Sequence, residues 1–223
     1  MNIISALLSN LQTFNTVSYP VYYDGIDSTV FDNVYAEQRN TQWCAAACIE
    51  MIGRLYGVNV SQEELAKNHC GIDMYGNAYN CPATIEVISS NLNFCRSNRC
   101  AQTLCIKPSL EKGQPNANRV ICELQRGNPI MIGHAVPNSN VGHAVLITGA
   151  EWSCQNGKHL IHKLILRDPW PSRENKLSNG RIVVNAPRNF VNTIYAHWYI
   201  SVSARENVAW NQNFTNNPFK QYW

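Results

Sequence analysis

Apolar residues recur at helical spacing in the segment that begins at Cys44. These positions, at i, i+4, i+7, i+8 and i+11, are Cys44, Cys48, Met51, Ile52 and Leu55. Such spacing places the side chains on one face of an amphipathic helix. The three alanines after Cys44 favour helix, and Gly57 is typical of a helix C-terminus. The pattern therefore predicts a helix that begins at or near Cys44 and stops by Gly57.

Three further helices are predicted before residue 129, and they run over 61–68, 82–92 and 116–126. The first begins with a capping box, in which Ser61 is followed three residues later by Glu64. The second has Pro82 at its first position, where the missing N–H costs no hydrogen bond. The first 37 residues are aromatic and polar by turns, and they predict extended segments and turns that lead to Cys44.

After residue 129 the apolar pattern changes to the period of strands. The expected strands run over 130–136, 143–150, 160–167, 181–184 and 195–202. Asn156-Gly157 and Asn179-Gly180 are typical of hairpin turns between antiparallel neighbours. Helices followed by antiparallel strands predict an α+β fold. We expect a cleft between the helical half and the sheet half.

The composition fits a globular chain and argues against several classes of function. The 223 residues, 45% of them hydrophobic and 15% charged, are enough for one domain or two tightly packed lobes. A net charge of +3 without a basic run argues against a nucleic-acid partner. No apolar run approaches the ~18 residues of a membrane span, and the start lacks the positive region of a secretory signal.

The nine cysteines indicate whether the protein works in an oxidising or a reducing environment. They are Cys44, Cys48, Cys70, Cys81, Cys95, Cys100, Cys105, Cys122 and Cys154. If one is a nucleophile, the other eight form an even set that four disulfides would use, with a pairing that the spacing leaves open. Cross-links would replace core burial in the polar stretch over 70–105. We therefore expect a secreted or extracellular location; zinc ligation and reduced cytosolic thiols are the alternatives.

Cys44, His143 and Asp168 occur in the order that a thiol hydrolase requires. The thiol attacks, an imidazole takes its proton, and an acid holds the imidazole in the working tautomer. A cysteine at a helix N-terminus is favoured as a thiolate by unpaired N–H groups and the helix dipole. Gln38 adds a fourth part, because an amide six residues before the nucleophile can donate to a developing oxyanion.

These segments together resemble the papain-like cysteine peptidases. The resemblance is closest to the bacterial branch that includes bacteriocin-leader peptidases and plant-pathogen effector proteases, and it covers about residues 38–170. The segments that carry it are Gln38, Trp43-Cys44-Ala45-Ala46, Gly127-Asn128-Pro129-Ile130, Gly142-His143-Ala144-Val145-Leu146-Ile147-Thr148-Gly149 and Leu166-Arg167-Asp168-Pro169-Trp170. An Asp-Pro pair at 168 suits the bacterial branch, whereas plant papains have Asn at this place.

The resemblance implies one papain-like catalytic domain over 1–223, with a helical lobe, then an antiparallel β-sheet lobe, and the active-site cleft between them. Residues 1–37 would be an extended segment or a propeptide. The mainly helical half would span 38–128, with a cysteine-rich insertion at 69–105, and the mainly β half would span 129–223.

The resemblance also implies a role for each site residue and a reaction. Cys44 would be the nucleophile, His143 the general base and acid, Asp168 the orienting residue, and Gln38 the oxyanion donor beside the Cys44 N–H. Peptide bonds would be hydrolysed through a thioester acyl-enzyme without a cofactor or metal. The expected partner is a protein or peptide substrate, and an inhibitor or immunity protein is a further candidate for a bacterial effector or toxin.

Two residues compete with the assigned ones. Cys48 lies one helical turn after Cys44, inside the predicted helix, and we expect it to face the core or to form a cross-link. His134 begins His-Ala-Val, a copy of the tripeptide at His143. We prefer His143, because Gly142 precedes it and a long apolar strand follows, as the resemblance implies.

Two other functions stay open at this point. A transglutaminase or glutamine deamidase would use the same triad on a side-chain amide, and it would modify a protein without cutting its chain. An inactive papain-like scaffold would bind a partner, and its cysteine would not react fast with an iodoacetamide-type reagent. Trp170 either covers the imidazole from water or packs in the core.

Overall fold

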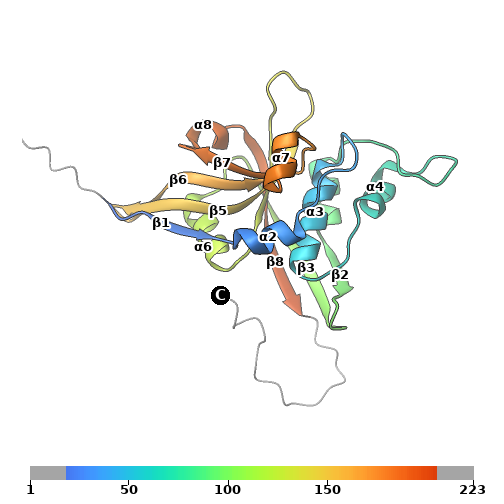
Figure 1. The fold of residues 1–223 in the computed structure, drawn as a ribbon, viewed down its shortest axis with the longest axis horizontal. Helices are drawn as coiled ribbons and strands as arrows, with labels where there is room; N and C mark the ends of the chain where they lie inside the picture. Colours follow the sequence, from blue (N-terminus) through green and yellow to red (C-terminus); the bar gives the residue numbers. More distant parts are fainter. Residues whose placement is uncertain (1–18, 205–223) are drawn as a thin grey trace, which may run out of the picture.

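One antiparallel sheet runs through the molecule, in a computed structural model that describes residues 19–204 (Figure 1). The strands are β1 (Tyr22–Gly25), β2 (Phe94–Ser97), β3 (Thr103–Lys112), β4 (Ile130–His134), β5 (His143–Gln155), β6 (Lys158–Arg167), β7 (Arg181–Asn185) and β8 (Ile194–Ala204). Their order is β2-β3-β8-β4-β5-β6-β7. β1 pairs with the second half of β5, beyond the part that pairs with β4.

Seven helices accompany this sheet in the described part of the chain. They are α2 (Ser28–Val34), α3 (Cys44–Leu55), α4 (Gln62–Cys70), α5 (Ile85–Asn91), α6 (Ala117–Gln125), α7 (Arg173–Ser178) and α8 (Arg188–Val191). The predicted α+β class is therefore confirmed. Over residues 19–204, every helix is too short or too polar to cross a membrane.

The central strands are apolar on both faces, because a helix packs against each face. On one face, Met131, Ala144 and Leu146 join the buried residues of α3 in one cluster. On the other face, Ile130, Ile132 and Val145 pack in a cluster with the apolar residues of α6. Side chains of a strand alternate between faces, so neighbouring residues of β4 and β5 belong to different clusters. This double burial fixes β5, whose first residue is His143.

The helices follow the sequence prediction closely. α3 begins at Cys44, and Gly57, with φ +71°, follows its end. α4 begins after Ser61, whose side chain accepts a hydrogen bond from the backbone N–H of Glu64. α5 begins at Ile85, three residues later than predicted, because Thr84 rather than the proline provides its N-terminal cap.

The strands predicted after residue 129 are present, but one of the two predicted hairpin turns is wrong. Asn156 and Gly157 both have positive φ and join β5 to β6 directly. Asn179 also has a positive φ, but it caps the C-terminus of α7. β6 and β7 still pair, with α7 in the connection between them, so the turn there is not a two-residue hairpin.

Five elements of the described residues have no counterpart in the prediction, namely the short helices α2, α7 and α8 and the strands β2 and β3. α2 lies in the segment expected to be extended, and it is short, capped by the side chain of Asp27, with Phe31 as its buried residue. β2 and β3 lie in the half expected to be mainly helical, where the cysteine spacing obscured their strand pattern. β3 pairs from Leu104 to Lys112 with β8, the last strand of the described residues, so residues far apart in sequence complete this side of the sheet.

The described segment before Cys44, residues 19–43, is part of the fold. β1 extends the sheet, Phe31 is fully buried, and Asp32 forms an ion pair with the buried Arg167. Removing this segment would leave a buried guanidinium without its carboxylate partner, which is strongly destabilising. Residues 22–34 are thus needed by the folded domain. The predicted domain over 1–223 includes 1–18 and 205–223, which lie outside the described residues.

The cysteines form two disulfides, so the prediction of four is wrong. Cys70 is bonded to Cys81, and Cys95 to Cys105, which are direct partners across β2 and β3. Five cysteines are free: Cys44, Cys48, Cys100, Cys122 and Cys154. Cys48 is buried in α3, and the last three are exposed on a turn, on α6 and on β5. Cys48, Cys100, Cys122 and Cys154 lie on four different elements, and none of them is bonded to another.

This pairing predicts a thiol count. Unfolded, non-reduced protein should give five titratable thiols with a thiol-reactive chromophore, and nine after reduction. The protein must be unfolded for this titration, because Cys48 is fully buried. One titratable thiol before reduction would indicate four disulfides, and nine before reduction would indicate none.

Candidate active site

Cys44 is the first residue of α3, and the apolar face of that helix positions it. Cys48, Met51 and Ile52 are completely buried against the sheet, whereas Cys44 at the helix end is only partly buried. The backbone N–H groups of a first helical turn have no partner within the helix. A negative charge at this position is therefore stabilised by those groups and by the helix dipole.

His143 and Asp168 come from neighbouring strands. His143 is the first residue of β5, and Asp168 directly follows the last residue of β6. Nε2 of His143 lies 2.7 Å from Oδ1 of Asp168 and donates to it, because a carboxylate only accepts. Nδ1 is therefore the ring nitrogen that remains for another partner. The two side chains are mostly shielded from water, with exposed fractions of 15% and 16%.

Cys44 lies next to this pair, and it contributes to the shifted pKa of His143. Burial lowers the pKa of His143, but the hydrogen bond to Asp168 and the interaction with Cys44 outweigh it and raise this pKa to about 9. Burial raises the pKa of Asp168, but its bond to His143 is stronger and the pKa is lowered. The site therefore holds a proton on the imidazole and a negative charge on the carboxylate at neutral pH.

Gln38 is buried on the turn that leads into α3. Its Nε2 donates to the carbonyl oxygens of Asn40, at 2.9 Å, and Thr41, at 3.1 Å. Its backbone N–H donates to the carbonyl oxygen of Pro169 at 2.8 Å, which ties this turn to the segment that carries Asp168. Both amide hydrogens are thus engaged by the turn, and among the described residues Oε1 has no partner.

Two residues that follow Asp168 hold this carboxylate in place, Trp170 on the adjoining turn and Asn175 on α7. The backbone N–H of Trp170 donates to Oδ1 of Asp168 at 2.8 Å, and its ring meets the ring of His143 edge-on, 6.2 Å between centroids. Trp170 is 45% exposed, so it covers the imidazole and is not core. Asn175, buried on α7, donates to the carbonyl oxygen of Trp170 and helps to lower the pKa of Asp168. Sequence reasoning missed Asn175, which no motif marks.

Tyr195 on β8 is a second neighbour of the site that sequence reasoning missed. A Cβ at Gly142 would lie 2.2 Å from its hydroxyl oxygen, and one at Gly133 would lie 2.9 Å from its ring. Glycine at these positions lets the phenol ring lie over the backbone beside His143. Burial and the charge of Cys44 both raise the pKa of Tyr195, because its hydroxyl lies near that thiol.

The two competing residues have other partners. Cys48 is completely buried, its thiol donates to the carbonyl oxygen of Ala144, and burial raises its pKa well above the ordinary value. This confirms that Cys48 faces the core. His134 is the direct partner of His143 across β4 and β5, with the rings 5.7 Å apart. Its Nδ1 contacts the carbonyl oxygen of Ala135, and burial lowers its pKa.

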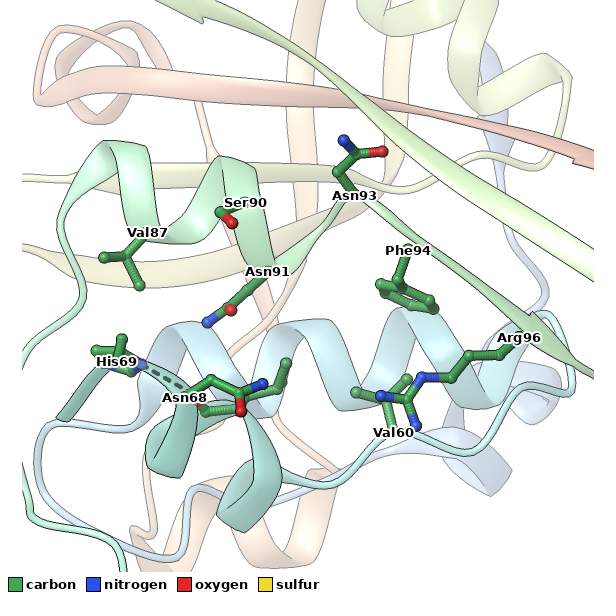
Figure 2. Close-up of a pocket in the computed structure, with 10 residues that line it drawn as sticks. Val60, Asn68, His69, Val87, Ser90, Asn91, Asn93, Phe94 and Arg96 are labelled. Carbon is green, nitrogen blue, oxygen red and sulfur yellow. Dashed lines mark hydrogen bonds between the residues drawn. The ribbon is translucent and has the colours of Figure 1, made fainter. Parts of the chain in front are cut away.

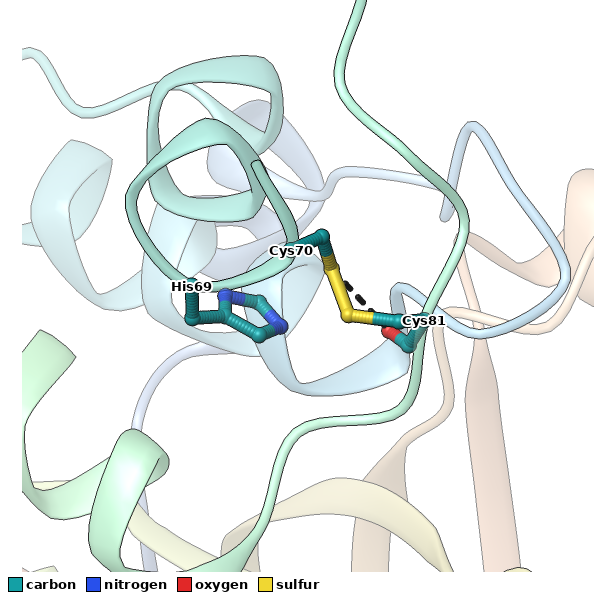
Figure 3. A group of neighbouring side chains, drawn as sticks. All are labelled: His69, Cys70 and Cys81. Carbon is teal, nitrogen blue, oxygen red and sulfur yellow. Dashed lines mark hydrogen bonds between the residues drawn. A yellow bond between two sulfur atoms is a disulfide. The ribbon is translucent and has the colours of Figure 1, made fainter. Parts of the chain in front are cut away.

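One group of side chains in residues 19–204 has the composition of a metal site, namely His69, Cys70 and Cys81. Their ligand atoms lie within 4.8 Å of one another. The two sulfurs are bonded to each other, as Figure 3 shows, so they are not thiolate ligands while the disulfide is closed. The third group, His69, binds the carbonyl oxygen of Leu65 through Nδ1.

A pocket of about 360 Å³ lies at a different place, between α4, α5 and β2 (Figure 2). Its polar lining includes Asn68, His69, Asn91 and Arg96. Cys44, His143 and Asp168 are not among the residues that line it. The pocket is therefore separate from the candidate active site.

Comparisons with known proteins identify the family of the chain. A model of the Peptidase_C39 like family matches residues 31–204. No curated protein matches the chain. Among solved structures, the chain is similar to the peptidase domain of Streptococcus ComA, a bifunctional ABC transporter involved in a quorum-sensing pathway, with 15% identity and a TM-score of 0.44. The match covers 77% of this chain and 98% of that one.

The raised pKa of His143 predicts its titration. By NMR, the imidazole should lose its proton at about pH 9 in the unmodified protein, and at lower pH in Asp168→Asn, where the acceptor is neutral. The folded pKa lies above the ordinary histidine pKa of 6.5, so this group's contribution to stability is full below pH 6.5 and is lost as the pH rises through about 9. His134, whose pKa is lowered mainly by burial, should titrate below His143 in the unmodified protein. If His143 lost its proton at the same pH in both proteins, the hydrogen bond between His143 and Asp168 would be contradicted.

The contact between Gly142 and Tyr195 predicts a coupled pair of substitutions. Gly142→Ala should lower the free energy of unfolding by ~1–3 kcal/mol, because the new methyl group overlaps the phenol ring. In Gly142→Ala with Tyr195→Ala the methyl group has space, so the double variant should lose less than the sum of the two single losses. Denaturant unfolding measures all three. Strict additivity would mean that Tyr195 is not the group that excludes a side chain at 142.

Proposed function

Because the chain belongs to the Peptidase_C39 like family and is a papain-like cysteine peptidase, we propose that Cys44, His143 and Asp168 are its catalytic triad. The observation that carries this proposal is the bond from Nε2 of His143 to Asp168, with Cys44 beside the same imidazole. This bond occupies Nε2, so Nδ1 is the ring nitrogen that is available to the thiol. A triad of nucleophile, base and orienting acid needs this arrangement.

The reaction is hydrolysis of a peptide bond in two steps. In the resting pair His143 already holds the proton of the thiol, and Sγ of Cys44 forms a bond to the carbonyl carbon of the substrate. The C–N bond breaks as His143 gives the proton to the leaving amine, which leaves a thioester on Cys44. His143 then takes a proton from water, the hydroxide attacks the thioester, and the acid product and free thiol are released. The raised pKa of His143 keeps the proton available for the leaving amine.

The oxyanion of each tetrahedral intermediate is stabilised by the backbone N–H of Cys44 and by the amide of Gln38. Gln38 is buried and anchored on both sides of the site, by its bonds to the turn before α3 and to Pro169. Its Nε2 donates to two carbonyl oxygens, and we propose that one hydrogen turns to the oxyanion when the carbonyl carbon is attacked. Loss of such a donor typically costs ~10²–10³ in kcat.

The substrate is a protein or peptide, which lies in a cleft between the helical lobe and the sheet lobe. This placement is supported by the origin of the triad, since Cys44 comes from α3 and His143 and Asp168 from the sheet. The exposed Trp170 and Tyr195 flank the imidazole and the thiol, so they would meet a bound chain. The two disulfides support an oxidising, secreted location for the enzyme.

The test compares Cys44→Ala with Cys48→Ala and His134→Ala on a protein substrate in mild reductant. We expect Cys44→Ala to lose turnover by on the order of 10⁶, as in other nucleophile deletions. Cys48→Ala and His134→Ala should keep most of the activity, because their side chains bind other partners. Activity is measured as newly formed chain ends by mass spectrometry.

Three outcomes would contradict the proposal. Turnover that persists in Cys44→Ala would mean that another residue is the nucleophile. Conversion of glutamine side chains without chain cuts would indicate a deamidase or transglutaminase instead. Slow labelling of Cys44 by iodoacetamide at pH 6 would indicate an inactive scaffold, since a thiolate reacts fast at this pH.

A further inference from the structure

Asn80 connects a disulfide-closed loop to the turn in front of Cys44. Its Oδ1 accepts from the backbone N–H of Gln42 at 3.0 Å, and its Nδ2 donates to the hydroxyl of Thr41 at 2.8 Å. The orientation of this amide is fixed by chemistry, because the N–H of Gln42 can only donate. A single side chain thus binds two successive residues of the turn, although Asn80 lies 38 and 39 positions away in sequence.

The turn that Asn80 binds also holds the side chain of Gln38. Nε2 of Gln38 donates to the carbonyl oxygens of Asn40 and Thr41. Asn80 and Gln38 therefore contact Thr41 from two sides, through its hydroxyl and its carbonyl group. A movement of Thr41 would move the amide of Gln38 with it.

The loop that presents Asn80 is well ordered by its own contacts. The disulfide between Cys70 and Cys81 closes it, and Asn80 is the residue directly before Cys81. Within the loop, the carboxylate of Asp73 accepts from the backbone N–H groups of Tyr75 and Asn77, and these bonds lower its pKa. A cross-link of this kind restricts the conformations that the loop can adopt. The loop can therefore act as a fixed support.

We propose that Asn80 is a positioning residue for the oxyanion site, and that the Cys70–Cys81 loop exists to support the turn over residues 40–42. This proposal rests on the proposed function, because Asn80 acts through Gln38 and does not touch the substrate. The disulfide thereby has a role in activity as well as in stability. Hydrogen bonds that hold a donor in its working geometry affect the transition state more than the bound substrate.

The experiment measures kcat and KM of Asn80→Ala, Gln38→Ala and the double variant. We expect Asn80→Ala to lose kcat about tenfold with little change in KM, less than Gln38→Ala, because a displaced donor retains part of its effect. In the Gln38→Ala background, Asn80→Ala should have no further effect on kcat. Asn80→Asp should recover most of the activity, since its carboxylate can accept from both Gln42 and Thr41.

Asn77→Ala is the matched control, because Asn77 lies in the same loop and its side chain binds Asp73 instead of the turn. It should leave kcat unchanged and shift the Tm by as much as Asn80→Ala. The rate at which iodoacetamide labels Cys44 should be the same in all of these variants, which separates oxyanion positioning from damage to the thiol.

The inference is overturned if Asn80→Ala keeps full kcat, or if Asn77→Ala lowers kcat as much as Asn80→Ala does. It is also overturned if Asn80→Ala lowers kcat by the same factor with Gln38 present and in the Gln38→Ala background. These outcomes are distinct from a failure of the proposed function. Turnover in Cys44→Ala, or full activity in Gln38→Ala, would reject the catalytic assignments themselves. A dead Cys44→Ala and an impaired Gln38→Ala beside a fully active Asn80→Ala would reject the role of Asn80 alone.

Discussion

The register between β5 and β6 is the constraint on which the candidate site depends. Leu146 is paired with Arg167, and this pairing brings the first residue of β5 next to Asp168, just beyond the end of β6. A slip of one residue would turn every side chain of a strand to the opposite face. Such a slip is strongly disfavoured here, because both faces of β5 are buried in apolar clusters. Packing far from the reaction thus sets the distance between the imidazole and the carboxylate.

The N-terminal segment gives this arrangement a second anchor. Arg167 is almost completely buried beside Asp168, and its guanidinium binds Asp32, Ser28 and the carbonyl groups at the end of α7. The hydroxyl of Tyr35 donates to the carbonyl oxygen of Asp168. The segment over 28–35 therefore connects both sides of the strand end that carries the acid. A buried charge needs all of these partners, so the segment cannot move without a large cost in stability.

Local patterns in the sequence were sufficient for some features and not for others. The stripe that begins at Cys44 and the run after His143 depend on residues close in sequence, and both elements were predicted correctly. Asn175, Tyr195 and Asn80 reach the site through contacts between distant segments, which periodicity does not record. The strands β2 and β3 escape prediction because closely spaced cysteines in a polar stretch are typical of a cross-linked loop. The predicted number of disulfides is wrong because an even count of cysteines does not show which sulfurs lie close together. The catalytic roles themselves remain proposals.

Cys48 has a consequence for how the enzyme tolerates oxidants. Oxidation of a reactive thiolate gives a sulfenic acid, which a neighbouring resolving thiol can convert into a reversible bridge. Cys48 is only one helical turn from Cys44, but its sulfur is sealed in the core against Ala144. To reach Cys44 it would have to leave that contact and open the packing of α3 on the sheet. Recovery from peroxide damage would therefore depend on small thiols that diffuse in from outside.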